Sequence, residues 1–161
     1  MLAAVQPATG EGFCLVMPEI STDVMNTFLA GFSATRAADE HALMVMDGAG
    51  WHRSGDLDVP GNISLLILPP YSPELNPIER IWLYLRERHL SHRLLDSYDD
   101  IVNACCKAWN QLTADRLQSL TSYPYLEKVR CISSSVLDRM ALRADQYARG
   151  VGGAATCKIR L

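Results

Sequence analysis

Residues 42–48 read ALMVMDG, and this stretch decides the fold class of the chain. Five consecutive apolar residues without polar alternation are typical of a strand that is covered on both faces. Asp47 and Gly48 end the run. A second run, residues 63–68, is apolar except for Ser64 and is stopped by two prolines. Two such strands predict an α/β layer, in which helices cover a buried sheet.

The segment before these strands predicts a hairpin followed by a helix. Short apolar runs at residues 1–5 and 13–17 flank a turn that contains Pro and Gly. Apolar residues then recur at helical spacing from Thr22, which we expect to cap the helix, to about Arg36. This order of elements indicates a mixed sheet, with an antiparallel hairpin leading into buried strands.

The segment after the two strands predicts three helices and a tail. The first helix begins at Pro77, the second spans residues 96–112, and the third follows Thr113, a predicted N-cap. We therefore expect residues 1–127 to form one α/β domain. Serine, glycine and scattered arginine residues after that point indicate a weakly packed or disordered tail at residues 128–161.

The composition is that of a globular domain. Of 161 residues, 48% are hydrophobic and 20% are charged, which is enough apolar material for a buried core. The formal net charge of −3 argues against a surface that binds DNA all over. No apolar run approaches the roughly 18–20 residues of a membrane helix, and the first apolar run is too short for a secretory signal. We therefore expect a cytoplasmic location and no membrane partner.

The five cysteines predict neither a zinc site nor a disulfide framework. Their number is odd, their spacings are irregular, and the sequence contains no CxxC pair. Cys105 and Cys106 lie in an apolar helical stretch, and we expect them in or near the core.

Asp47 is the first candidate for chemistry. It follows a predicted buried strand, and ligand sites in open α/β sheets lie just beyond the carboxyl ends of strands. Gly48 and Gly50 carry no Cβ, so backbone or ligand can approach closely. Asp is also common after a strand simply because it caps the turn. Taken alone, this aspartate fits the turn cap better.

Glu79 is the second candidate. Residues 69–82 read PPYSPELNPIERIW, in which Asn76 suits an N-cap and Pro77 suits the first helical position. Glu79 then lies three residues after the cap, where it can complete a capping box. A carboxylate in a first helical turn is also held rigidly, as a metal ligand must be. The two interpretations are compatible.

The two carboxylates together predict a site for a hard divalent cation. Mg²⁺ prefers oxygen ligands and takes few of them from the protein. Two such ions about 4 Å apart can activate an attacking oxygen and stabilise the leaving oxygen at a phosphodiester. Such a site normally needs three acidic side chains, because two doubly charged ions must be bridged and balanced.

The segments 46–52, which reads MDGAGWH, and 68–82 resemble the mariner-like DDE superfamily of transposases and their bacterial insertion-sequence relatives. The 31 residues between Asp47 and Glu79 also suit that family. The resemblance runs from about residue 4 to about residue 125. It implies a ribonuclease H-like fold, dependence on Mg²⁺ or Mn²⁺, and cleavage and strand transfer at transposon ends. It also implies that Asp47 is the second catalytic acid and Glu79 the third, both as metal ligands.

The chain departs from that family at its start. The family's first catalytic Asp lies on an earlier strand, and the sequence begins after the corresponding position. Asp23 and Asp39 do not replace it, because the first belongs to a helix start and the second to a polar link. The family's N-terminal helix-turn-helix region also has no counterpart. We therefore expect a partial ribonuclease H-like domain that lacks its first strand or strands and is inactive alone.

The remaining candidates are contacts to DNA. Arg80 and Arg86 lie in and just past the predicted Glu79 helix, where they could face phosphates. A solvated helix face explains either arginine equally well. His52 could contact DNA or water, although a lone histidine in a loop is more often only solvated.

The leading hypothesis is a DNA transposase catalytic-domain fragment whose parent acts by two-metal hydrolysis and transesterification. Its expected partners are transposon-end and target DNA, with the upstream transposase portion or further copies of the chain. Its expected location is the bacterial cytoplasm, associated with the nucleoid when bound to DNA. The alternative is a non-enzymatic remnant or regulator that binds DNA or full-length transposase. An unrelated Mg²⁺ phosphohydrolase leaves residues 70–82 unexplained.

Overall fold

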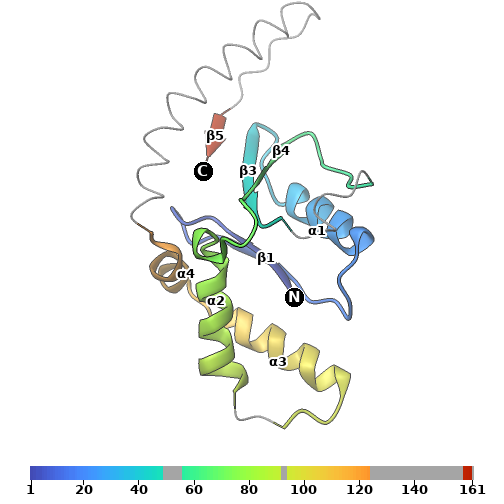
Figure 1. Cartoon of the computed structure of the whole chain (residues 1–161), viewed down its shortest axis with the longest axis vertical. Coiled ribbons are helices and arrows are strands. Elements are labelled where there is room, and N and C mark those ends of the chain that lie inside the picture. The colour runs from blue at the N-terminus through green and yellow to red at the C-terminus, as the bar shows by residue number, and fades with distance from the viewer. Residues whose placement is uncertain (49–55, 92–93, 124–157, 161) are drawn as a thin grey trace, which may run out of the picture.

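The computed structural model describes residues 1–48, 56–91, 94–123 and 158–160, and within them the fold is mixed α/β (Figure 1). The predicted α/β class is therefore confirmed. The strands are β1 (Leu2–Val5), β2 (Gly12–Leu15), β3 (Glu40–Met46), β4 (Ile63–Ile67) and β5 (Lys158–Arg160). The helices are α1 (Thr22–Ala34), α2 (Ile78–Leu85), α3 (Tyr98–Asn110) and α4 (Ala114–Thr121), with the short η2 (Pro73–Leu75) and the π-helical η3 (Arg86–Leu90) on either side of α2.

The described strands form two separate sheets instead of the single mixed sheet that the sequence predicts. β1 and β2 form an antiparallel pair, with Leu2 opposite Leu15. The second sheet has the order β4-β3-β5, and both of its pairs are parallel. In the β3–β4 pair, Ala42 lies opposite Ile63 and Met46 opposite Ile67. The two sheets are joined by side-chain packing and not by a described backbone ladder.

Helix α1 provides that packing, because its apolar face contacts both sheets (Figure 1). Leu29 is 0% exposed and Phe28 is 2% exposed, and the latter ring lies 5.4 Å from the ring of Phe13 on β2. The same cluster includes residues of β1, β3 and β4. Burying a large apolar side chain stabilises a fold by roughly 1.5–3 kcal/mol. The helix therefore holds the hairpin and the parallel strands under one cover.

The hairpin is covered on its second face by the C-terminal helices. A second cluster centres on Ile81 and Leu85 of α2, which are 0% and 1% exposed, and reaches Val5 of β1. Trp82 and Trp109 are half-buried and pack against this cluster, as the apolar helix faces predict. The hairpin is thus the middle layer between α1 on one side and α2, α3 and α4 on the other.

The expectation that β3 and β4 are covered on both faces is wrong for the part of the chain that the structure describes. Met44 and Met46 are buried beneath α1, but Val45 is 38% exposed and Leu66 is 48% exposed. These alternate residues point to opposite faces of the strands. An uninterrupted apolar run cannot tell whether both faces are already covered or whether one awaits a partner.

Helix boundaries follow the predicted capping chemistry with small shifts. Ser21, and not Thr22, caps α1, because its hydroxyl accepts a hydrogen bond from the Val24 N–H at 3.3 Å. Thr113 caps α4 as predicted, and its hydroxyl accepts from the Arg116 N–H at 3.3 Å. Shifts of one or two residues are common when polar residues are adjacent at a helix start.

Three of the five cysteines, Cys14, Cys105 and Cys106, lie among the described residues. Cys105 is half-buried, but Cys106 is exposed, so the second is not the core thiol that the sequence predicts. Burial raises the pKa of the Cys14 thiol to about 12, which keeps it protonated and unreactive near neutral pH.

In the predicted tail, the described residues are those of β5; residues 128–157 are not described. None of the described helices is long and apolar enough to cross a membrane.

The hairpin turn is tied to α4 through Gly10, which has a φ of +72°. A Cβ at this position would overlap the backbone carbonyl of Ala114, the first residue of α4. Nearby, the Gln118 side-chain amide donates to the Ala8 carbonyl at 2.6 Å. A left-handed backbone and the absence of side-chain space therefore both require glycine here.

We expect Gly10→Ala to lower the free energy of unfolding by about 2–4 kcal/mol, since strain and a backbone clash add together. The matched control is Gly61→Ala, because a Cβ at Gly61 meets no atom within 4 Å. Thermal denaturation followed by circular dichroism compares the two variants. Equal melting temperatures would show that α4 does not pack closely on the hairpin turn.

Candidate functional site

Asp47 lies directly after β3, at the carboxyl end of a parallel strand pair. The Met46 carbonyl accepts a hydrogen bond from the Leu68 N–H at 2.8 Å, which extends the β3–β4 pairing up to this point. The Asp47 residue is exposed. The strand pair therefore places this carboxylate at the sheet edge where ligand sites of α/β folds usually lie.

The connection from β4 to α2 is held by local backbone contacts. Asn76 is 8% exposed, and its side-chain oxygen accepts from the Ile78 N–H at 3.4 Å. Its carbonyl accepts from the Glu79 N–H at 3.1 Å. The helix begins at Ile78, its N-cap position is Pro77 and not the predicted Asn76, and Asn76 contacts the first turn from one residue before the cap.

Glu79 lies in the first turn of α2 and is exposed. Within the described residues its carboxylate makes no hydrogen bond or ion pair, and no side chain caps the helix in the manner of a capping box. The capping-box interpretation is therefore wrong for the described contacts. Ile81 and Leu85 anchor the helix in the core, so that a helix held by its buried face carries this exposed carboxylate.

Asp47 and Glu79 line the same groove, which has a volume of about 570 Å³. One comes from the end of β3 and the other from the start of α2, two elements that the sequence separates by a long connection. The groove continues from them between β1 and β3, and its walls are mainly apolar. The two acidic residues that the sequence singles out therefore both border this groove.

The donor set of this site suits a hard cation. Two carboxylates supply oxygen ligands only, and Mg²⁺ sites are commonly built from one or two protein carboxylates completed by water and substrate phosphates. Across residues 1–48, 56–91, 94–123 and 158–160, no group of three or more His, Cys, Asp or Glu side chains is arranged to hold a metal. The same search covers the histidine nitrogen and cysteine sulfur ligands that favour zinc.

Comparison with known proteins identifies the family. Residues 1–102, which include both Asp47 and Glu79, match a family model described as DDE superfamily endonuclease. The chain belongs to the DDE superfamily of endonucleases. It is 46% identical over 112 residues to an uncharacterized protein of Sinorhizobium fredii, and the alignment covers 70% of this chain and 83% of that relative. No solved structure gives a significant match.

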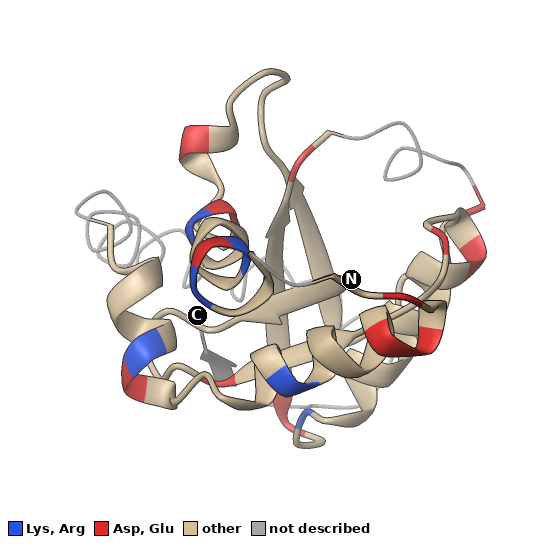
Figure 2. Ribbon diagram, turned by 90° about the horizontal axis from the view of Figure 1, so that it is seen from below, with Lys and Arg blue, Asp and Glu red and all other residues tan. Residues whose placement is uncertain are grey.

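The basic residues of this DDE domain are dispersed. Figure 2 shows acidic and basic positions interspersed along the described helices. The Arg80 guanidinium lies over the Tyr123 ring, 5.2 Å from its centroid. Arg86 is exposed and follows Glu79 by seven residues, so it lies on the same side of the helix about 10 Å further along. His52 lies outside the described residues.

Tyr71 is a candidate that sequence reasoning did not single out. It is 99% exposed and has a φ of 59°, a left-handed backbone conformation that is uncommon for a large side chain. It lies in the loop that leads from β4 to Glu79. The signal in the sequence is an aromatic residue between prolines, where packing cannot account for it. Such outliers often lie at functional sites.

Proposed function

We propose that this chain is the C-terminal part of a mariner-like, ribonuclease H-like transposase catalytic domain that cuts transposon ends and joins them to target DNA. The observation that carries the proposal is that Asp47 and Glu79, from separate elements of a DDE-family domain, line one groove. Parallel strands beside an antiparallel hairpin, with helices on both sides, support the ribonuclease H-like assignment.

In this proposal Asp47 and Glu79 hold Mg²⁺ or Mn²⁺ through their carboxylate oxygens. The bound ions would polarise the scissile phosphate and lower the pKa of the attacking water or hydroxyl. The residues of the chain contribute position: β3 and β4 hold one carboxylate, and the buried face of α2 holds the other. Because both are attached to regular elements, the distance between them varies little, as a metal site requires.

Two carboxylates carry two negative charges, whereas two divalent cations carry four positive charges. We therefore propose that a third acidic ligand is needed for a two-metal centre, and that the upstream transposase portion or another copy of the chain supplies it. Without that ligand the chain is inactive, since a misplacement of the attacking group by about 1 Å costs roughly 100-fold in rate.

DNA contacts in this proposal are local. Arg86 faces phosphates beside Glu79, Arg80 contributes once its guanidinium leaves the Tyr123 ring, and Tyr71 stacks on an exposed base. His52 is a further proposed contact. The net charge of −3 means that most of the electrostatic attraction comes from a partner. The proposed catalytic domain comprises residues 1–127, followed by a tail at residues 128–161 whose described strand, β5, pairs with β3. The proposed substrate places the protein at DNA in the bacterial cytoplasm.

The first test is metal binding. We expect Asp47→Asn and Glu79→Gln each to raise the Kd for Mn²⁺ by at least about tenfold, a change of about 1.4 kcal/mol in binding free energy. The control is Glu74→Gln, which removes an exposed carboxylate of η2 that does not line the groove. Mn²⁺ titration followed by electron paramagnetic resonance measures free ion. The same loss for all three variants would reject a site at Asp47 and Glu79.

The second test is nuclease activity. We expect purified residues 1–161 to leave supercoiled plasmid intact in Mg²⁺ or Mn²⁺, as judged by agarose gel electrophoresis. The control is the Asp47→Asn variant purified in the same way, which reveals contaminating nucleases. Nicking by the unchanged chain that is lost in this variant would refute the proposal that a further acidic ligand is needed.

The third test is the salt dependence of DNA binding. We expect Arg86→Gln to weaken binding to a labelled duplex and to reduce the slope of log K against log salt by about one, because one phosphate contact is lost. Arg116→Gln is the matched control, since the Arg116 guanidinium lies over the Tyr84 ring, 5.4 Å from its centroid. Tyr84 follows Glu79 by five residues and so lies on a different side of α2 from Glu79. Fluorescence anisotropy at several salt concentrations gives both slopes. An unchanged slope for Arg86→Gln would remove it from the interface.

A further inference from the structure

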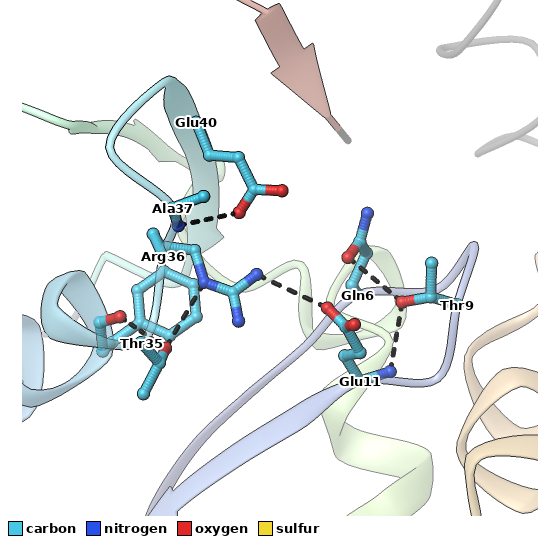
Figure 3. Close-up of polar contacts among 8 residues, drawn as sticks. Gln6, Thr9, Glu11, Thr35, Arg36, Ala37 and Glu40 are labelled. Atoms are coloured by element: carbon cyan, nitrogen blue, oxygen red, sulfur yellow. Dashed lines mark hydrogen bonds and ion pairs between the residues drawn. The ribbon is translucent and has the colours of Figure 1, made fainter.

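The polar side chains at the end of the groove away from Asp47 have partners within the chain. The Arg36 guanidinium lies 3.5 Å from the Glu11 carboxylate, and the Glu40 carboxylate accepts a hydrogen bond from the Ala37 N–H at 3.2 Å (Figure 3). Arg36, Glu11 and Glu40 all line the groove. The positive charge of the arginine is therefore balanced by a neighbouring side chain.

Two further polar groups of the groove lining also bond within the chain. The Nε2 atom of His41 lies 2.8 Å from the Ser64 hydroxyl oxygen. The Thr121 hydroxyl, on a residue that is 1% exposed, donates to the Leu117 carbonyl at 2.7 Å. Polar groups in protein interiors are nearly always hydrogen-bonded, so a donor without a partner in such surroundings calls for an explanation.

Asn76 carries such a donor. The residue is 8% exposed, and its side-chain oxygen accepts a hydrogen bond from the Ile78 N–H at 3.4 Å. Because a backbone N–H can only donate, this contact identifies the oxygen of the amide, and the nitrogen must point the other way. Within the described residues that nitrogen makes no hydrogen bond.

The side-chain nitrogen of Asn76 opens onto the groove. Every buried side-chain nitrogen and oxygen in the described part of the chain has a partner, so a nitrogen without one is not buried. Since Asn76 lines the groove, its small exposed fraction faces that groove. By contrast, the side-chain amides of Asn26 and Asn62 donate to the carbonyls of Asp56, at 3.2 Å, and Ser33, at 3.3 Å.

The backbone of Asn76 holds this donor beside Glu79. Its N–H donates to the Pro73 carbonyl at 3.0 Å, and its carbonyl accepts from the Glu79 N–H at 3.1 Å. Both Asn76 and Glu79 line the groove. A donor whose direction is fixed in advance needs little reorganisation when an acceptor binds. A neutral, fixed donor therefore lies next to a carboxylate that we propose as a metal ligand.

An anionic oxygen is the acceptor that suits this donor best. A hydrogen bond to an ionised acceptor is roughly twice as strong as one between neutral groups. Phosphate oxygens are the anionic oxygens that the proposed function brings to this groove. Asparagine side chains are among the groups that contact phosphates in complexes of proteins with DNA, where such contacts fix the position of the backbone.

We propose that the Asn76 side-chain amide donates a hydrogen bond to a phosphate oxygen of DNA bound in the groove, and so positions the phosphodiester beside Glu79. The inference rests on the function proposed above, because it takes DNA as the ligand. It adds to the two carboxylates a neutral group that contacts the substrate itself.

The test uses the full chain labelled with ¹⁵N, in which asparagine side-chain amides give nuclear magnetic resonance signals. Loss of a signal in Asn76→Asp assigns that signal to Asn76. We expect a short DNA duplex in Mg²⁺ to shift it, while the Asn62 signal stays in place because its donor is already used. Dimethyl phosphate, a phosphodiester without bases, should shift the same signal at higher concentration.

The Asn76→Asp variant also tests the donor in a binding assay. A carboxylate oxygen still accepts from the Ile78 N–H, but the other oxygen replaces the nitrogen and cannot donate. We expect the Kd for the labelled duplex, measured by fluorescence anisotropy, to rise at least about tenfold. We expect the melting temperature not to fall, since the contact to Ile78 is kept. The control is Asn103→Asp, which adds the same charge at an exposed position of α3 that does not line the groove.

Mn²⁺ titration separates this inference from the metal site. Asn76→Asp should not raise the Kd for Mn²⁺, whereas Asp47→Asn should. A raised Kd for Mn²⁺ in Asn76→Asp would overturn the inference, because the residue would then support the carboxylates instead of contacting phosphate. If Asp47→Asn and Glu79→Gln leave Mn²⁺ binding unchanged, the metal site is rejected, and the amide signal still decides the role of Asn76.

Three other results would overturn the inference. An Asn76 amide signal that neither probe shifts would mean that the donor meets no phosphate. A shift with the duplex but not with dimethyl phosphate would assign the contact to a base. Equal weakening of duplex binding by Asn76→Asp and Asn103→Asp would show that the added charge, and not the lost donor, is the cause.

Discussion

The packing of α1 across two sheets is the contact on which the rest of the structure depends. Leu29 and Phe28 are almost fully buried, and their cluster includes strands of both sheets. A helix that covers two sheets at once can hold them side by side without a backbone ladder between them. The groove exists because this apolar contact, and not hydrogen bonding, fixes the hairpin relative to β3 and β4.

The candidate site follows from the same arrangement. The parallel pairing of β3 and β4 ends just before Asp47, and the first turn of α2 carries Glu79, which is exposed while Ile81 and Leu85 of the same helix are buried. Each carboxylate is held by an element whose position is set by the core. That both carboxylates line one groove matters more than either residue alone, because one carboxylate at a strand end has many structural explanations.

The sequence by itself determined the α/β class, the apolar strands β3 and β4 and the helix cap at Thr113, because these features depend on local periodicity and turn chemistry. The assignment of Asp47 and Glu79 as metal ligands stays a prediction. It did not predict two separate sheets, the exposed face at Val45 or the conformation of Tyr71. An apolar run reports only that its residues avoid water, and not which partner covers them. Only the tertiary structure decided that, because contacts between residues distant in sequence depend on how α1 positions the two sheets.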